Sequence, residues 1–233
     1  MFDNKSMHHD CFKEAVCINS KRVYDACRDR DCLEDLRVYF CDKDQEIIKH
    51  ALSVKLKSAE VIHVYIDTEP VPFNRGYYCV DLTIYFAMAV DAALSPIGNP
   101  TQLYGISVCH KKAILYGSEG SVKTFCSEYV LDGPDVSLQP SNNLPIVTVQ
   151  VADPVPLGSK LVRVDSCPNL GTLPTGICQR FPGDFSAPIS DKIVEASIGM
   201  FMLIELEREV QMLIPVYDFC MPEKICIEES VMI

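Results

Sequence analysis

From residue 52 onward, the chain is a succession of short β-like segments separated by turn residues, and this spacing limits the folds that it can adopt. β-Branched and aromatic residues are frequent in the segments, and proline, glycine and asparagine punctuate them at fairly regular intervals. A helical period of about 3.6 residues is weak throughout. The candidate strands are LSVKLKSAEVIHVYI, GYYCVDLTIYFAMAV, QLYGISVCHKKAILYG, SVKTFCSEYVL, LPIVTVQVADPVPL, KLVRVDSC, IVEASIGMFMLIELE and REVQMLIPVY.

Regularly spaced short strands are typical of antiparallel sandwiches and barrels. We therefore predict a mainly β protein: an antiparallel β-sandwich or barrel-like domain with short helices near the N-terminus and a long loop rich in cysteine, proline and glycine. One or two helical turns are expected in DCFKEAVCI and a short helix in QEIIKHAL. DCLEDL predicts a single turn, because Asp31 is a suitable N-cap and Glu34 follows three residues later.

Three parts of the chain are predicted from these patterns. Residues 1–50 form a cysteine-rich, charge-alternating segment, packed on the core or swapped between protomers, residues 51–219 form the β-rich core domain, and residues 220–233 form a cysteine-containing tail. Residues 165–188 combine Cys167 and Cys178 with clustered proline and glycine and few apolar residues, which predicts a long surface loop. A disulfide between these two cysteines is one way to close it.

Net charge limits the partners that we expect. The chain has 32 acidic and 21 basic residues, a formal net charge of −11. Binding to nucleic acid or to an anionic membrane surface needs concentrated positive charge, and Lys21-Arg22 and Lys111-Lys112 are only pairs, expected at the solvated surface. The longest apolar run, residues 198–204, is shorter than the about 20 residues that span a bilayer. Neither nucleic acid nor a membrane span is therefore expected.

The cysteine content conflicts with the expected compartment. The polar N-terminus lacks the apolar stretch of a signal peptide, so we expect synthesis in the cytoplasm without an export signal. Cytosolic proteins rarely carry as many as the 12 cysteines of this chain unless the thiols have a role. Seven lie near the two ends, before residue 42 or after residue 219. Cys79, Cys109 and Cys126 lie in apolar runs and are expected to be small buried side chains.

Motifs for catalysis or metal binding are absent from the sequence. Cys27 and Cys32 are separated by four residues, a spacing that zinc permits but that is not diagnostic. The acidic residues of 25–35 lack the glycine and the final glutamate of a calcium loop. Cys109 and His110 are adjacent, but neighbours on a strand point to opposite faces. We expect no enzymatic activity and no cofactor.

Charges of both signs are interleaved in residues 23–40. This pattern predicts a salt-bridged docking segment, in which arginines pair with aspartates locally or on a neighbouring molecule, and in which Cys27 and Cys32 can lock the contact. The candidate interface charges are Arg22, Arg28, Asp29, Arg30, Asp31 and Arg37.

Four stretches, VYDACRDRDCLEDLRVYF, EPVPFNRGYY, YGSEGSVKTF and LEREVQMLIPVYDFCMPEKIC, resemble a clostridial family of cysteine-rich spore coat and exosporium proteins, some of which tile into two-dimensional layers. The similarity extends from about residue 17 to residue 226. Residues 165–188 depart from it, because some relatives have denser cysteine clusters where this chain has only Cys167 and Cys178. That difference puts any function of such a cluster in doubt for this chain.

The resemblance implies a structural protein that self-assembles into an ordered layer, sheet, shell or tube at the spore surface. Its expected partners are copies of itself and other spore-surface proteins. Thiols made in the cytosol would then meet an oxidising exterior after lysis. The candidate cross-linking residues are Cys11, Cys17, Cys27, Cys32, Cys41, Cys167, Cys178, Cys220 and Cys226.

Two alternatives remain open at this point. The first is a cytosolic metal- or redox-responsive binding protein that uses the N-terminal cysteine cluster as its ligands, namely Cys17, Cys27, Cys32 and Cys41. The second is a small-molecule enzyme on a β scaffold.

Overall fold

The computed structural model describes residues 14–120, 144–164, 173–185 and 191–217. This part of the chain is mainly β, as predicted, with short helices. The predicted strand over residues 121–131 lies outside the described residues. The elements are β1 (Glu14–Phe40), α1 (Asp42–His50), β2 (Ser53–Pro70), β3 (Tyr77–Ala93), β4 (Thr101–Tyr116), β5 (Ile146–Val151), β6 (Val155–Arg163), α2 (Thr175–Cys178) and β7 (Lys192–Val216).

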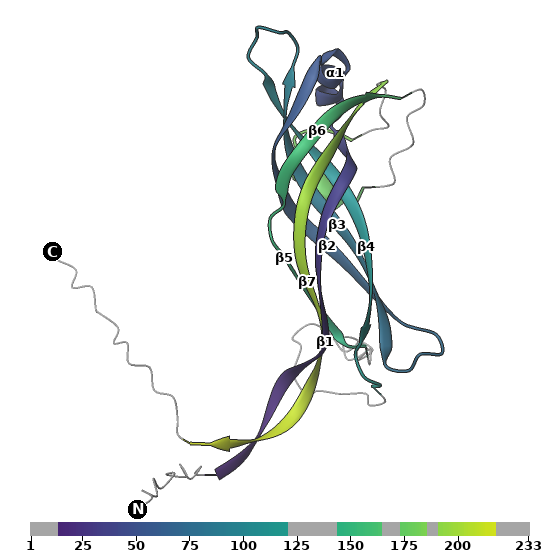
Figure 1. The fold of residues 1–233 in the computed structure, drawn as a ribbon, viewed down its shortest axis with the longest axis vertical. Coiled ribbons are helices and arrows are strands. Elements are labelled where there is room, and N and C mark those ends of the chain that lie inside the picture. Colours follow the sequence, from purple (N-terminus) through teal and green to yellow (C-terminus); the bar gives the residue numbers. More distant parts are fainter. Residues whose placement is uncertain (1–13, 121–143, 165–172, 186–190, 218–233) are drawn as a thin grey trace, which may run out of the picture. The chain divides into compact units, whose positions relative to one another are not determined.

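These strands form one antiparallel sheet in the order β2-β3-β4-β1-β7-β5, and β6 also pairs with β7 (Figure 1). The sheet does not close through strand pairing, but β2 and β6 approach each other at Ser159. The backbone N–H of Leu56 donates to Ser159 Oγ at 2.8 Å, and the Ser159 hydroxyl donates to the carbonyl of Val54 at 3.4 Å. The arrangement is therefore sandwich- or barrel-like without being a closed barrel.

The chain divides into two compact units, and the boundary lies inside two strands. Residues 23–208 form the larger unit, and residues 1–22 and 209–233 form the smaller one. Both β1 and β7 contribute to both units, since each is unbroken at the boundary. The structure thus divides the chain near residues 22 and 208, whereas the sequence predicts boundaries after residues 50 and 219.

Alternate residues of the long strands build the core of the larger unit. On β3, the even-numbered side chains from Tyr78 to Ala92 are buried, and on β7 the even-numbered ones from Val194 to Leu206 are buried. Successive side chains of a strand point to opposite faces, so one face of each strand lines the core. Each fully buried large side chain stabilises the fold by about 1.5–3 kcal/mol relative to an exposed one.

Residues 31–36 lie within β1, so the predicted helical turn was wrong. Leu33 is buried before Asp35, and Val38 and Phe40 are buried after it. Asp35 has φ 55°, a left-handed conformation that aspartate adopts more readily than most residues. Its carboxylate lies 2.6 Å from Lys160 Nζ of β6. This irregularity changes the inward-facing residues from odd to even numbers, as a β-bulge does.

Other segments differ in length from the expected ones. The helix expected in QEIIKHAL exists as α1, which begins at Asp42 and carries the fully buried Ile48. The described part of DCFKEAVCI, from Glu14, is strand. LPIVTVQVADPVPL is divided between β5 and β6, and the last two predicted strands are one strand, β7. Tertiary pairing decides these lengths, because β propensity depends strongly on context.

The predicted loop over residues 165–188 is described only from residue 173 to residue 185, and this part is anchored by apolar side chains. Ile177 of α2 is buried in a cluster with Tyr85 and Ile106. The rings of Phe181 and Phe185 pack edge to face, with their centroids 5.8 Å apart. The expectation of few apolar anchors was therefore wrong for these residues.

Replacing Phe86 by alanine is expected to reduce the free energy of unfolding by about 3–5 kcal/mol, because a fully buried ring leaves a cavity. Phe73 is fully exposed and provides the matched control, and F73A should change the free energy by less than about 0.5 kcal/mol. Urea denaturation followed by circular dichroism measures both. Equal effects of the two substitutions would contradict the described core.

Candidate functional site

The alternating charges of β1 are separated onto two faces of the strand. Arg28, Arg30 and Cys32 are exposed, whereas Asp29 and Asp31, on the opposite face, are partly buried. A strand has a period of two residues, so the sequence pattern Arg-Asp-Arg-Asp places arginines on one side and aspartates on the other. The predicted docking segment is therefore one strand with a basic outer face and an acidic inner face between residues 28 and 31.

The aspartates of the inner face pair with a lysine from a neighbouring strand. Lys111 of β4 lies 3.0 Å from Asp29 Oδ2 and also contacts Asp31 Oδ2, and its side chain is 19% exposed. Burial opposes the charge of Lys111, but hydrogen bonds from Lys111 to Asp31 and Asp29 outweigh it and raise the pKa of the lysine. The Lys111 hydrogen bond, with the lysine charge, lowers the pKa of Asp31. Lys111, expected at the solvated surface, instead joins β1 to β4.

The arrangement around Cys109 does not supply a nucleophile–base pair. Cys109 is buried, and burial raises the pKa of its thiol, which favours the unreactive protonated form. His110 is exposed on the other face, where its Nδ1 lies 3.0 Å from Thr83 Oγ1. The sequence correctly predicted that the two neighbours point apart.

The described cysteines are all free and differ widely in exposure. Cys17 and Cys32 are exposed, Cys27, Cys79 and Cys178 are partly buried, and Cys41 and Cys109 are buried. Burial is the first cause of the raised pKa of Cys27, Cys41 and Cys178. Cys11, Cys126, Cys167, Cys220 and Cys226 lie outside the described residues.

Burial removes Cys41 from the thiols that a neighbouring molecule can reach. Its side chain lies against Gly183, where an added Cβ would stand 2.9 Å from Cys41 Cβ. The φ of 130° at Gly183 also favours glycine, so this close approach is built into the chain. Cys79, expected to be buried, is only partly so, and its Sγ contacts Asp81 Oδ2 at 3.8 Å.

The predicted cysteine ligands do not converge in the described structure. Cys27 and Cys32 are five positions apart on β1 and lie on opposite faces, as their partly buried and exposed positions indicate. Within residues 14–120, 144–164, 173–185 and 191–217, no group of three or more His, Cys, Asp or Glu side chains could hold a metal ion.

A groove, here called the Cys32 groove, lies on the outer side of β1 and β7. It encloses about 500 Å³ and is lined by Arg30, Asp31, Cys32, Ala152, Asp153, Val155, Gly199, Met200 and Phe201. β5 pairs with β7 from Met202 onward and β6 pairs with it up to Gly199, so the chain leaves the sheet between them. The N–H of Ala152 still donates to the Phe201 carbonyl at 3.0 Å.

Apolar and charged side chains share the walls of the Cys32 groove. The guanidinium of Arg30 lies over the ring of Phe201, 5.7 Å from its centroid. Phe201 is 41% exposed and Val155 is 62% exposed. Sequence analysis identified Arg30 and Cys32 but missed these apolar residues. The available signal was the position of Phe201, an aromatic residue on the odd-numbered face of a segment whose even-numbered residues are apolar.

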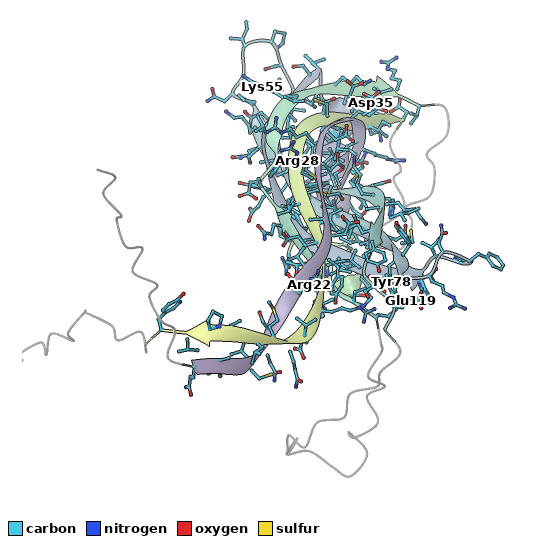
Figure 2. All side chains as sticks on the ribbon, turned by 60° about the horizontal axis from the view of Figure 1, so that its bottom comes forward. Arg22, Arg28, Asp35, Lys55, Tyr78 and Glu119 are labelled. Atoms are coloured by element: carbon cyan, nitrogen blue, oxygen red, sulfur yellow. The ribbon has the colours of Figure 1, made fainter. Side chains whose placement is uncertain are left out.

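The smaller unit contains a second exposed feature, a two-stranded ribbon made by the first part of β1 and the last part of β7 (Figure 1). Figure 2 shows side chains projecting from both of its faces. Met212 is 44% exposed and Leu213 is 71% exposed, and the following Tyr217 is 58% exposed. Cys17 is also exposed on this ribbon.

Replacing Lys111 by methionine is expected to destabilise the fold at neutral pH, because two carboxylates lose their shared cation. The contribution of Asp31, whose pKa is lowered, is present above its unfolded pKa of about 3.9 and is lost as the pH falls through the folded value. The stabilising contribution of Lys111, whose pKa is raised, is present below its unfolded pKa of about 10.4 and is lost as the pH rises through its pKa in the folded protein. The difference in the free energy of unfolding between K111M and the unchanged protein should thus become smaller at both low and high pH.

Lys112 provides the control for this experiment. It pairs with Asp81 at 3.1 Å on the exposed face, and exposed ion pairs contribute little. Denaturant titrations over a pH series should therefore show a smaller effect for K112M. A loss of unfolding free energy in K111M that does not depend on pH would contradict the ion pairs of Lys111 with Asp29 and Asp31.

Alkylation of the folded, reduced protein should modify Cys17 and Cys32 first, and should reach Cys41 and Cys109 only after denaturant is added. The reason is exposure together with the raised pKa of the two buried thiols. Peptide mass spectrometry after timed quenching identifies the labelled residues. Modification of Cys41 as fast as Cys32 would show that the packing at Gly183 is not maintained in solution.

Among the described residues, no helix has the length and apolar character needed to cross a membrane. Comparison with known proteins found no matching protein-family model, no matching curated protein and no matching solved structure. The function is therefore inferred from the residues of this chain and from the surfaces that they form.

Proposed function

We propose that this chain is a structural protein whose copies self-assemble into an ordered layer, sheet, shell or tube. The two-stranded ribbon of the smaller unit is the observation that carries the proposal. An isolated pair of strands is at best marginally stable in water and needs a further strand or a packed face. The described part of the smaller unit contains only these two strands, so a second molecule is a natural source of the missing contacts.

The exposed residues of the ribbon support contacts on both of its faces. Met212 and Leu213 are consecutive residues of β7, so their side chains point to opposite faces. Both are exposed in the single chain. A ribbon with an exposed apolar side chain on each face can pack between two neighbours, and such contacts favour extended assembly over a closed pair.

The outer edges of the ribbon provide a second route to the same assembly. Edge strands present backbone N–H and C=O groups, and a strand of another chain can add to them through main-chain hydrogen bonds. Pairing of this kind requires little side-chain specificity. It is therefore compatible with partners that are copies of the same chain.

Thiols on the ribbon and in the sequence that flanks its strands support covalent locking of the assembly. Cys17 is exposed on β1, Cys11 precedes this strand in the sequence, and Cys220 and Cys226 follow β7. Disulfide formation between neighbours becomes favourable once their thiols are held at high effective concentration. A cytoplasmic origin followed by exposure at the spore surface, which the sequence resemblance implies, would supply the change from reducing to oxidising conditions.

Replacing Leu213 by aspartate is expected to abolish assembly, because it places an uncompensated charge where the exposed leucine would pack against a neighbour. The matched control is L52D, since Leu52 is 61% exposed but belongs to the larger unit. Electron microscopy and light scattering of the full chain, with and without reductant, measure the outcome. A monodisperse monomer for the unchanged protein at high concentration, or equal assembly of L213D and L52D, would overturn the proposal.

A further inference from the structure

We propose that the Cys32 groove binds the C-terminal segment of a second copy, residues 218–233, and that Cys226 of that segment forms a disulfide with Cys32. The inference deepens the proposed function, on which it rests, by naming one contact between copies. Residues 218–233 lie outside the described residues, and the chemistry of the groove selects them as its occupant.

The groove presents an accessible thiol beside apolar and cationic groups. Cys32 is exposed and free, and it shares the groove with Phe201 and Val155, which are also exposed. Arg30 lies in the groove, and Arg28 is exposed on the same face of β1. The acids of the groove are Asp31, which pairs with Lys111 together with Asp29, and Asp153.

Charge distinguishes the two extensions that could occupy the groove. Residues 218–233 contain four acids, Asp218, Glu223, Glu228 and Glu229, against one base, Lys224. Residues 1–13 contain two acids and two lysines, so they have no net charge when histidine is neutral. The acidic extension is the better partner for a face that carries Arg28 and Arg30, because complementary charge favours and orients the encounter.

The spacing of residues around Cys226 also selects a direction. In an extended segment, residues two apart lie on the same side, so Cys226 and Glu228 point the same way. Laid antiparallel to β1 with Cys226 over Cys32, the segment places Glu228 over Arg30. The parallel direction would place Glu228 over Glu34 and is disfavoured by like charge.

The covalent step is an ordinary two-electron oxidation. The Sγ–H bonds of Cys32 and Cys226 are lost, one Sγ–Sγ bond forms, and two protons and two electrons pass to an oxidant. That oxidant is dioxygen or a low-molecular-weight disulfide, whose two sulfurs are released as thiols. The link joins two different surfaces, the groove of one copy and the extension of the next, so it is heterologous and can propagate.

Mixing two complementary variants of the full chain tests the proposal. C32S retains the extension but lacks the groove thiol, and C226S retains the groove but lacks the partner thiol. One variant is labelled with nitrogen-15, both are reduced, mixed and oxidised with oxidised glutathione, and disulfide peptides are identified by mass spectrometry. The mixture should give a Cys32–Cys226 peptide that joins a labelled to an unlabelled chain, which neither variant forms alone.

Two further variants serve as matched arms. C220S removes the other thiol of the same extension and should leave the Cys32–Cys226 link unchanged. R30E should lower the initial rate of cross-linking by about tenfold, and adding E228R to the partner should restore the rate, since the pair is then reversed in sign.

Several results would overturn the inference. These are a Cys32–Cys226 link found only within one chain of the unchanged protein, loss of the Cys32 link in C220S instead of C226S, and an R30E rate that equals that of the unchanged protein. Ordered assembly without the Cys32–Cys226 link would overturn this contact and leave the proposed function standing. A chain that stays monomeric under both reducing and oxidising conditions would overturn the proposed function itself.

Discussion

The alternation of side chains along β1 is the constraint on which the rest of the structure depends. One strand of Glu14–Phe40 has to supply core residues on one face and surface residues on the other. Between residues 27 and 33 its odd positions face inward, and after Asp35 the even positions do. Without that change of register, Val38 and Phe40 would lie on the solvent face and the core would lose both side chains.

The same constraint gives the charged residues their distinct roles. Asp29 and Asp31 turn inward, where Lys111 holds them and links β1 to β4. Arg30 and Cys32 turn outward, where Phe201 and Val155 complete a groove. A run that looks uniform in composition therefore divides into a stabilising ion cluster and a candidate contact surface. The chemistry of each side follows from the neighbouring strands, and not from β1 alone.

β1 and β7 also explain why one chain can have a compact part and an incomplete one. In the larger unit, each has neighbours, β4 beside β1 and β5 and β6 beside β7. In the smaller unit, the described residues comprise these two strands only, with Met212 and Leu213 exposed. The larger unit has a buried core of its own, whereas the two strands of the ribbon lack further strands and can gain contacts from another molecule.

The mainly β fold was predictable because the period of two and the spacing of turns are local properties of the sequence. The opposite orientation of Cys109 and His110 was predictable for the same reason. Sequence patterns failed where distant segments decide the outcome. DCLEDL satisfies a local rule for a helical turn, yet these residues are strand, because pairing with neighbouring strands outweighs a weak capping preference.

The sequence by itself therefore determined the β class, the alternating faces and the presence of many thiols. Only the tertiary structure decided which thiols are accessible. The sequence placed Cys32 and Cys41 in the same N-terminal group of candidate cross-linking residues, but Cys32 is exposed and Cys41 is buried. It also decided that Lys111 is a partner of Asp29 and Asp31, residues about 80 positions away. The physical reason is that exposure and ion pairing depend on which strands become neighbours, and that is set by packing of the whole core.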